Sequence, residues 1–161
     1  MGADPEEFTT MVVDYRARAF AFLLQMVGNR EDAMDLLQDG FLKLHSNWHL
    51  RDPDRPFAPW MYRIFRNLAI DHLRKRSRRQ ISELDPDRHG AAGRTRPLLR
   101  IQLWRAVNEL PEEQREVFVL RELHGLSYAE IGDVTGSSAS TVTTRLHHAR
   151  QKLRQKLRGY L

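Results

Sequence analysis

Every strong hydrophobic periodicity in this 161-residue chain is that of an α-helix. Between residues 12 and 26, for example, Val12, Tyr15, Ala19, Phe22 and Met26 recur at intervals that place them on one helix face. No stretch shows a comparable alternation of apolar and polar residues, the mark of a half-buried β-strand. Without a sheet, such helices bury their apolar faces only against one another, so the sequence predicts an all-α fold.

The composition of the chain changes between Gln80 and Pro97. These 18 residues contain two Gly, two Pro and few large apolar side chains, which is typical of a flexible linker. We therefore predict two small helical domains, over residues 1–79 and 98–161, joined by a linker over residues 80–97.

Turn and capping residues divide the first domain into three predicted helices. Gly28 ends the first helix, and Asn29 is a suitable N-cap for the second. Three prolines between His49 and Pro59 predict a loop. A third helix then runs from Trp60 into the basic segment 74–79. The predicted apolar faces of the second and third helices are Ala33, Leu36, Leu37, Phe41 and Leu44, and Trp60, Met61, Ile64, Phe65, Leu68, Ala69 and His72.

The second domain contains four predicted helical segments. Pro111 suits the first position of the second segment, and Ser127 with Glu130 forms a capping box for the third. Residues 135–137 form a turn, and the last helix runs from about Ser138 to Leu157. The buried residues expected in the second segment are Val117, Leu120 and Leu123.

The stretch from Ser127 to Arg150 has the pattern of a helix-turn-helix, in which a short capped helix, a tight turn and a longer basic helix follow one another. Short polar side chains near the start of the second helix let its backbone enter a DNA major groove, and later cations contact phosphates. The alternative is a solvated helical hairpin. The candidate residues are Ser140, Thr141, Thr143 and Thr144 for bases, and Arg145, Arg150, Lys152 and Arg154 for phosphates.

Aromatic and cationic residues alternate around the start of the third helix. Such a mixture suits the unstacked bases of single-stranded DNA. The alternative, which is stronger for Trp60 and Phe65, is that the aromatics belong to the core. The residues concerned are Trp48, Phe57, Trp60, Tyr62 and Phe65, together with Arg51, Arg55, Arg63 and Arg66.

An acidic cluster with Gln38 lies on the second helix, where Asp32, Asp35 and Asp39 are expected to share a face. No phosphate loop, His pair or EF-hand spacing accompanies these carboxylates. A solvated face or a protein-docking face therefore explains them better than a metal or catalytic site.

Several classes of function are excluded or disfavoured. The chain has no cysteine, which removes disulfides, thiolate nucleophiles and cysteine-based metal sites. His45 and His49 precede a proline-rich stretch, and the adjacent His147 and His148 cannot face one ion well. No catalytic triad, membrane span or signal sequence is evident, so we expect a cytoplasmic protein without cofactor, metal or enzymatic activity. The net charge of +5 is compatible with nucleic acid.

Three motifs, in this order, resemble those of the extracytoplasmic-function sigma factors, small two-domain members of the bacterial sigma-seventy family. Residues 29–44 (NREDAMDLLQDGFLKL) resemble the segment of sigma region two that docks on polymerase. Residues 60–76 (WMYRIFRNLAIDHLRKR) resemble its promoter-melting helix. Residues 110–118 (LPEEQREVF) and 126–131 (LSYAEI), with the turn and helix that follow, resemble sigma region four.

The resemblance implies roles for individual residues. Asp35, Gln38, Asp39 and Phe41 would bind the polymerase, and the loop 47–57 would form a pocket for a minus-ten base. Asn67 would help capture this base. The full minus-ten set is Asn47, Trp48, Arg63, Arg66, Asn67, Asp71 and Arg74. The minus-thirty-five set is Ser140, Thr141, Thr143, Thr144, Arg145, His147, His148 and Arg150.

The sequence also departs from the family pattern. Gly132 stands where members usually have Ala, and Thr135 where they usually have Leu, which predicts a looser first helix in the helix-turn-helix. Thr143 and His148 stand where basic residues are common. The resemblance implies a sigma factor that binds core RNA polymerase and promoter DNA and is held inactive by an anti-sigma protein. The alternative is a plain helix-turn-helix regulator with a sensory first domain.

Overall fold

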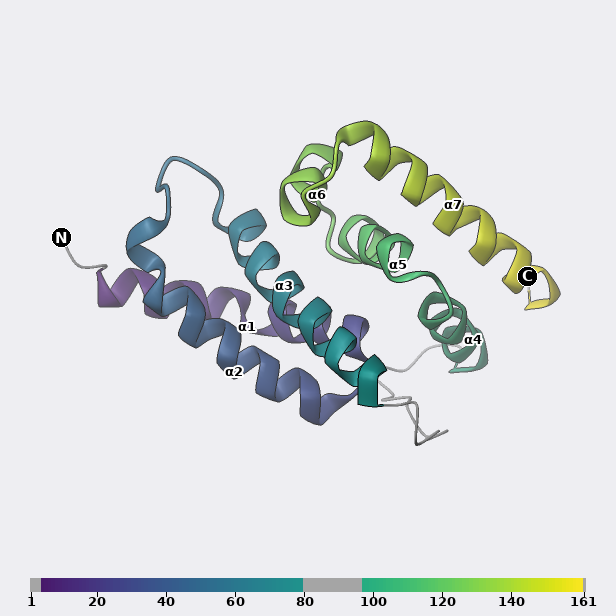
Figure 1. The fold of residues 1–161 in the computed structure, drawn as a ribbon, viewed down its shortest axis with the longest axis horizontal. Coiled ribbons are helices and arrows are strands. Elements are labelled where there is room, and N and C mark those ends of the chain that lie inside the picture. Colours follow the sequence, from purple (N-terminus) through teal and green to yellow (C-terminus); the bar gives the residue numbers. More distant parts are fainter. Residues whose placement is uncertain (1–3, 80–96, 161) are drawn as a thin grey trace. The chain divides into compact units, whose positions relative to one another are not determined.

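The computed structural model describes residues 4–79 and 97–160, and these residues form helices without any strand (Figure 1). The chain divides into two compact units, residues 1–89 and 90–161. The division falls inside the predicted linker, of which residues 80–96 lie outside the described residues. The predicted all-α architecture is confirmed.

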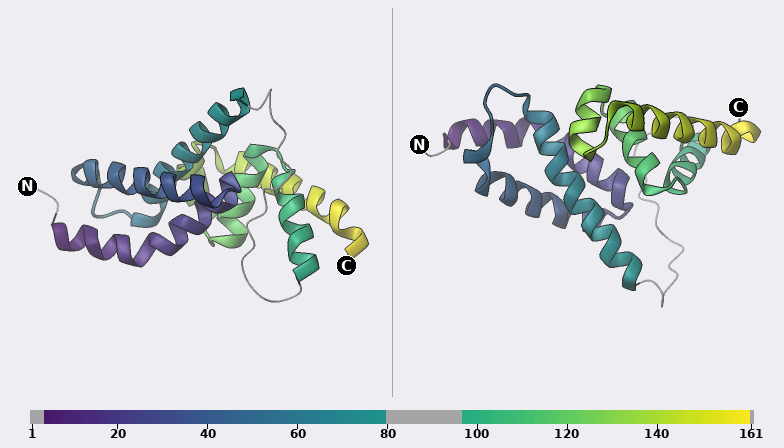
Figure 2. Two further views of the ribbon diagram at one scale, coloured as in Figure 1. Left: turned by 90° about the horizontal axis from the view of Figure 1, so that it is seen from below. Right: turned by 45° about the horizontal axis from the view of Figure 1, so that its top comes forward.

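The first unit is a bundle of three long helices, α1 (Pro5–Val27), α2 (Arg30–Ser46) and α3 (Phe57–Arg79), with a short 3₁₀ turn, η1 (Trp48–Leu50), between the last two. Each long helix packs against the other two, as the two further views in Figure 2 show. The predicted break between α1 and α2 is confirmed: Gly28 has a φ of 71°, and the Asn29 side chain accepts a hydrogen bond from the Asp32 N–H at 3.0 Å. The fully buried residues include Phe22, Leu23, Leu44, Met61 and Phe65.

The start of α3 differs from the prediction. The helix begins at Phe57, three residues before Trp60, and Pro59 occupies its third position. Proline is tolerated there because the first N–H groups of a helix have no partner within the helix. Part of the predicted loop is instead the η1 turn.

Helices α2 and α3 pack tightly against each other at Gly40, a residue for which the sequence predicted no role. Glycine within a helix costs about 1 kcal/mol relative to alanine, so its presence needs a packing reason. A Cβ at this position would overlap the ring of Phe65 and lie 2.8 Å from its Cζ. The flat Phe65 ring therefore packs directly on the α2 backbone.

We expect Gly40→Ala to destabilise the protein by about 1–3 kcal/mol, because overpacking at Phe65 outweighs the gain in helix propensity. Urea denaturation of Gly40→Ala, Phe65→Leu and the double variant measures this. The two changes should be strongly non-additive, since a smaller side chain at position 65 makes room for the new methyl group. Stabilisation by Gly40→Ala alone would contradict the packing argument.

The second unit contains four helices, α4 (Pro97–Asn108), α5 (Glu112–Phe118), α6 (Tyr128–Thr135) and α7 (Ala139–Leu157). A π-helical turn, η2 (Val119–Leu123), extends α5, and a 3₁₀ turn, η3 (Arg158–Tyr160), follows α7. The long helix α7 packs against α4, α5 and α6. On the inward side of α7, Val142, Leu146, Ala149 and Leu153 are buried, and Leu157 is half-buried.

Two details of this unit correct the sequence prediction. Pro111 is the N-cap of α5 and not its first helical residue. Leu123, expected to be buried, is 43% exposed. The π turn, with its hydrogen bond from the His124 N–H to the Val119 carbonyl at 3.2 Å, adds a residue to one helical turn and rotates the following side chains. Val119 is buried in its place.

Candidate nucleic-acid and protein interfaces

The helix-turn-helix of the second unit is formed by α6, the turn 136–138 and α7. The predicted capping box is present: Ser127 Oγ accepts from the Glu130 N–H at 3.1 Å, and Glu130 Oε2 accepts from the Ser127 N–H at 3.0 Å. Gly136 ends α6 with a φ of 69°, a conformation that glycine adopts without strain. Ser138 then caps α7 by accepting from the Thr141 N–H at 3.2 Å.

Gly132 lies where this turn folds back on α6. Its carbonyl accepts from the Ser137 N–H at 3.0 Å, and a Cβ at position 132 would lie 2.8 Å from the Ser137 carbonyl oxygen. The helix is capped at both ends and glycine allows the tight return, and the looser α6 expected from the sequence stays a prediction.

The first turns of α7 present a row of polar side chains. Thr143 and Thr144 donate their hydroxyl protons to the carbonyls of Ala139 and Ser140 at 2.9 and 3.0 Å. Both residues are exposed, so their oxygen lone pairs and methyl groups can contact base edges. Of the candidate base-reading residues, Thr141 is half-buried and the others are exposed, namely Ser140, Thr143, Thr144, His147 and His148.

The candidate phosphate contacts on α7 are partly engaged within the unit. Arg145 donates to Ser137 Oγ at 2.9 Å and lies 3.5 Å from Glu113 Oε2. Arg150 forms an ion pair with Glu122 on the π turn, and this hydrogen bond raises the pKa of the guanidinium. Lys152 and Arg154 are exposed and form no ion pair with any other described residue.

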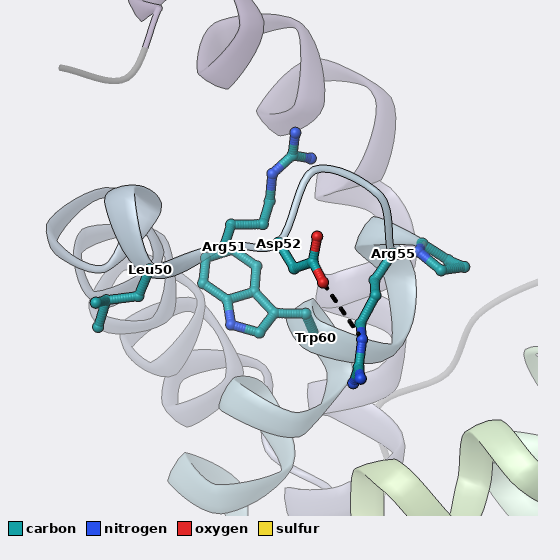
Figure 3. Close-up of a pocket in the computed structure, with 6 residues that line it drawn as sticks. Leu50, Arg51, Asp52, Arg55 and Trp60 are labelled. Atoms are coloured by element: carbon teal, nitrogen blue, oxygen red, sulfur yellow. Dashed lines mark ion pairs between the residues drawn. The ribbon is translucent and has the colours of Figure 1, made fainter. Parts of the chain in front are cut away.

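A pocket of about 220 Å³ lies in the first unit, between η1, the loop that follows it and the start of α3 (Figure 3). It falls within the predicted base-pocket loop 47–57. Asp52 and Arg55 form an ion pair of 3.5 Å at its mouth, and Asp52 Oδ1 accepts from the Asp54 N–H at 3.0 Å. The lining residues are Leu50, Arg51, Asp52, Arg55, Pro56 and Trp60.

Only one of the candidate stacking aromatics lines this pocket. Trp60 is half-buried, whereas Phe57, Tyr62 and Phe65 are buried in the core. Burial raises the pKa of Tyr62 to about 12. Trp48 is only 5% exposed and packs against Trp60 with 6.1 Å between ring centroids. Trp48 therefore supports the pocket from behind and offers little surface to a base.

The polar face of α3 continues from this region toward the C-terminal end of the helix. Arg63, Asn67, Asp71 and Arg74 are exposed at intervals of four, four and three, so they form one row. Arg66 is half-buried beside the row and donates to Asn67 Oδ1 at 3.3 Å. The remaining candidate, Asn47, is the half-buried C-cap of α2.

The acidic residues of α2 divide into two groups, contrary to the single face expected. Asp35 and Asp39 are exposed, whereas Asp32 faces α3, where its Oδ2 lies 3.0 Å from His72 Nε2 and 4.0 Å from Arg76 Nη1. Asp32 therefore holds α2 against α3, and Arg76 also donates to the Val27 carbonyl at 3.0 Å.

The exposed surface of α2 also carries apolar residues that the sequence analysis missed. Met34 is 41% exposed and Leu42 is 62% exposed, on either side of Gln38. Both residues are four positions from Gln38 and lie off the buried stripe. This spacing could have indicated that they share the exposed face of Gln38. Phe41 is half-buried, with its ring edge on Phe65 at 5.4 Å between centroids. Exposed apolar side chains rimmed by polar ones mark a candidate protein-interaction site.

None of the helices in the described residues has both the length and the apolar content required to cross a membrane. Nor do three or more His, Asp or Glu side chains gather in residues 4–79 and 97–160 as a metal site would require.

Comparison with known proteins identifies both units. Residues 11–79 match the family model "Sigma-70 region 2", and residues 100–153 match "Sigma-70, region 4". The chain is 30% identical to the ECF RNA polymerase sigma factor SigW of Bacillus subtilis, over 96% of this chain and 91% of the relative. It is 28% identical to the RNA polymerase sigma-H factor of Pseudomonas aeruginosa, over 98% and 90%.

Solved structures agree with this result. CnrH, solved in complex with the cytosolic domain of CnrY, is 27% identical, with a TM-score of 0.73 over 99% of this chain and 92% of that one. The sigma factor RpoE of Bartonella quintana, solved with the anti-sigma factor NepR, shares the fold at 23% identity, with a TM-score of 0.79 over 97% and 99%. The chain therefore belongs to the extracytoplasmic-function (ECF) family of RNA polymerase sigma factors and serves as an alternative sigma factor in transcription initiation.

Proposed function

We propose that three of the surfaces described above each bind a different partner during promoter recognition. The exposed face of α2 binds core RNA polymerase. The first turns of α7 bind the duplex minus-thirty-five element, and the pocket with the polar row of α3 captures the unpaired minus-ten strand. In this proposal the protein acts in the cytoplasm, catalyses no reaction itself and is held inactive by an anti-sigma protein that covers one or more of these surfaces.

One observation carries the proposal: a single chain combines a helix-turn-helix with a pocket that opens beside a row of polar and cationic side chains. A plain helix-turn-helix regulator needs only the first of these. Run-off transcription with purified core polymerase and a promoter library tests the proposal. Duplex binding without promoter-dependent transcripts would favour the plain regulator.

The pair Asp35→Ala and Asp39→Ala should weaken binding to core polymerase by about tenfold, since about 1.4 kcal/mol of charge complementarity is removed. Fluorescence titration of labelled protein with core polymerase measures this affinity. The pair Glu6→Ala and Asp14→Ala is the matched control, because it removes two exposed carboxylates from α1. Equal affinities for the two double variants would exclude the docking face on α2.

Asn67→Ala should impair open-complex formation more than closed-complex binding. Asn67 is exposed in the middle of the α3 row, and a hydrogen-bonded base contact is worth about 1–3 kcal/mol. Permanganate footprinting of minus-ten thymines reports the melted strand. Ser77→Ala, a change at another exposed position farther along α3, should leave the footprint unchanged. A wild-type footprint for Asn67→Ala would show that the residue makes no important base contact.

Glu122→Gln should strengthen binding to minus-thirty-five duplex by up to about fivefold, because Arg150 no longer has to exchange an ion pair for a phosphate. Asp133→Asn is the control with the same charge change, at an exposed position of α6. Anisotropy titrations at several salt concentrations measure both affinities. If the DNA affinity of both variants increases equally, the increase comes from the change in net charge alone, and Arg150 does not contact a phosphate.

A further inference from the structure

The first turn of α1 contacts the segment that leads into the pocket loop. Glu7 Oε1 lies 2.6 Å from Arg51 Nη2. The neighbouring Phe8 ring packs edge-on against Trp48 and His45, with centroid separations of 5.2 and 5.0 Å. Glu7 and Phe8 precede residues 11–79, which match sigma region two, so one side of this contact lies outside the matched residues.

Arg51 is the residue through which this contact reaches the pocket. It lines the pocket and directly follows η1. Its guanidinium also lies over the Trp48 ring, 4.5 Å from the centroid, and its side chain is only 10% exposed. Figure 3 shows this guanidinium turned away from Asp52 and Arg55. Its charge is therefore directed toward α1, while the rest of the residue forms part of the pocket wall.

The rest of the pocket loop makes few contacts with the helical bundle. Residues 52–56 are exposed, and their hydrogen bonds are local, such as that from the Arg55 N–H to the Asp52 carbonyl at 3.2 Å. At the far end, Phe57 is buried against Trp48 and Tyr15. The path of the loop therefore depends on two anchors, Arg51 at its start and Phe57 at its end.

We propose that Glu7 and Phe8 are positioning residues for capture of the minus-ten strand, acting by holding Arg51 and Trp48 at the pocket wall. The inference rests on the proposed function of the pocket. Removal of Glu7 leaves a largely buried guanidinium without its carboxylate, which is more disruptive than the loss of a fully exposed pair. Arg51 is then free to leave the wall, and the pocket loses its shape before any base enters.

The test compares Glu7→Arg with Glu6→Arg in full-length protein bound to core polymerase. Both variants gain the same charge in the same exposed turn of α1, but only Glu7 pairs with Arg51. The readout is the affinity for a fluorescent single-stranded minus-ten oligonucleotide, and its ratio to the affinity for a base-substituted oligonucleotide. Thermal melting and binding to minus-thirty-five duplex are measured in parallel.

We expect Glu7→Arg to bind the minus-ten strand about tenfold more weakly than Glu6→Arg and to discriminate less between the two oligonucleotides, with unchanged duplex binding. Glu7→Gln, which keeps the size of the side chain, should lose about threefold at unchanged melting temperature. Phe8→Leu should likewise lose about threefold in affinity for the minus-ten strand.

Equal strand affinities for Glu7→Arg and Glu6→Arg, when wild type binds the strand, would overturn the positioning role. Failure of the wild-type complex to bind the strand would instead overturn the proposed function of the pocket.

Discussion

The contact between α2 and α3 at Gly40 and Phe65 determines how the first unit presents its surfaces. Phe65 lies directly on the α2 backbone because position 40 has no side chain, and Asp32 ties the same two helices together through His72 and Arg76. With these inner faces fixed, Asp35 and Gln38 of α2 and the Arg63–Arg74 row of α3 can only face outward. A single helix-helix contact therefore orients both the candidate polymerase surface and the candidate DNA surface.

The second unit depends on local chemistry at chain turns. Ser127 fixes where α6 begins, Gly136 fixes where it ends and Ser138 fixes where α7 begins. Four buried residues of α7 set its rotation. Once the start and rotation of α7 are set, the exposed positions 140, 143, 144, 147 and 148 follow from the helical repeat. The minus-thirty-five candidates thus share one surface because of helix capping and core packing. Contacts between the candidates themselves are not needed to bring them together.

Local features of this kind could be predicted from the sequence, and long-range ones could not. Asn29 and the Ser127–Glu130 capping box act within a few residues, so their helix starts were predicted correctly. Leu123 was misplaced because a π turn changes the helical phase without any sequence signal that periodicity detects. Asp32 was grouped with the exposed acids because its partners lie forty residues away. The pairing of Glu7 with Arg51 was missed for the same reason.

The long-range ion pairs also change how the charge of the protein should be understood. Arg51, Arg145 and Arg150, all candidates for nucleic-acid contact by sequence, are each paired with a carboxylate from another element. Contact with a phosphate then exchanges one ion pair for another, which lowers the net gain in free energy. The count of 26 Lys and Arg residues therefore overstates the cationic surface that is ready to bind DNA. Binding surfaces held in one complex raise one another's effective concentration, so contacts with the two DNA elements and with the polymerase reinforce one another.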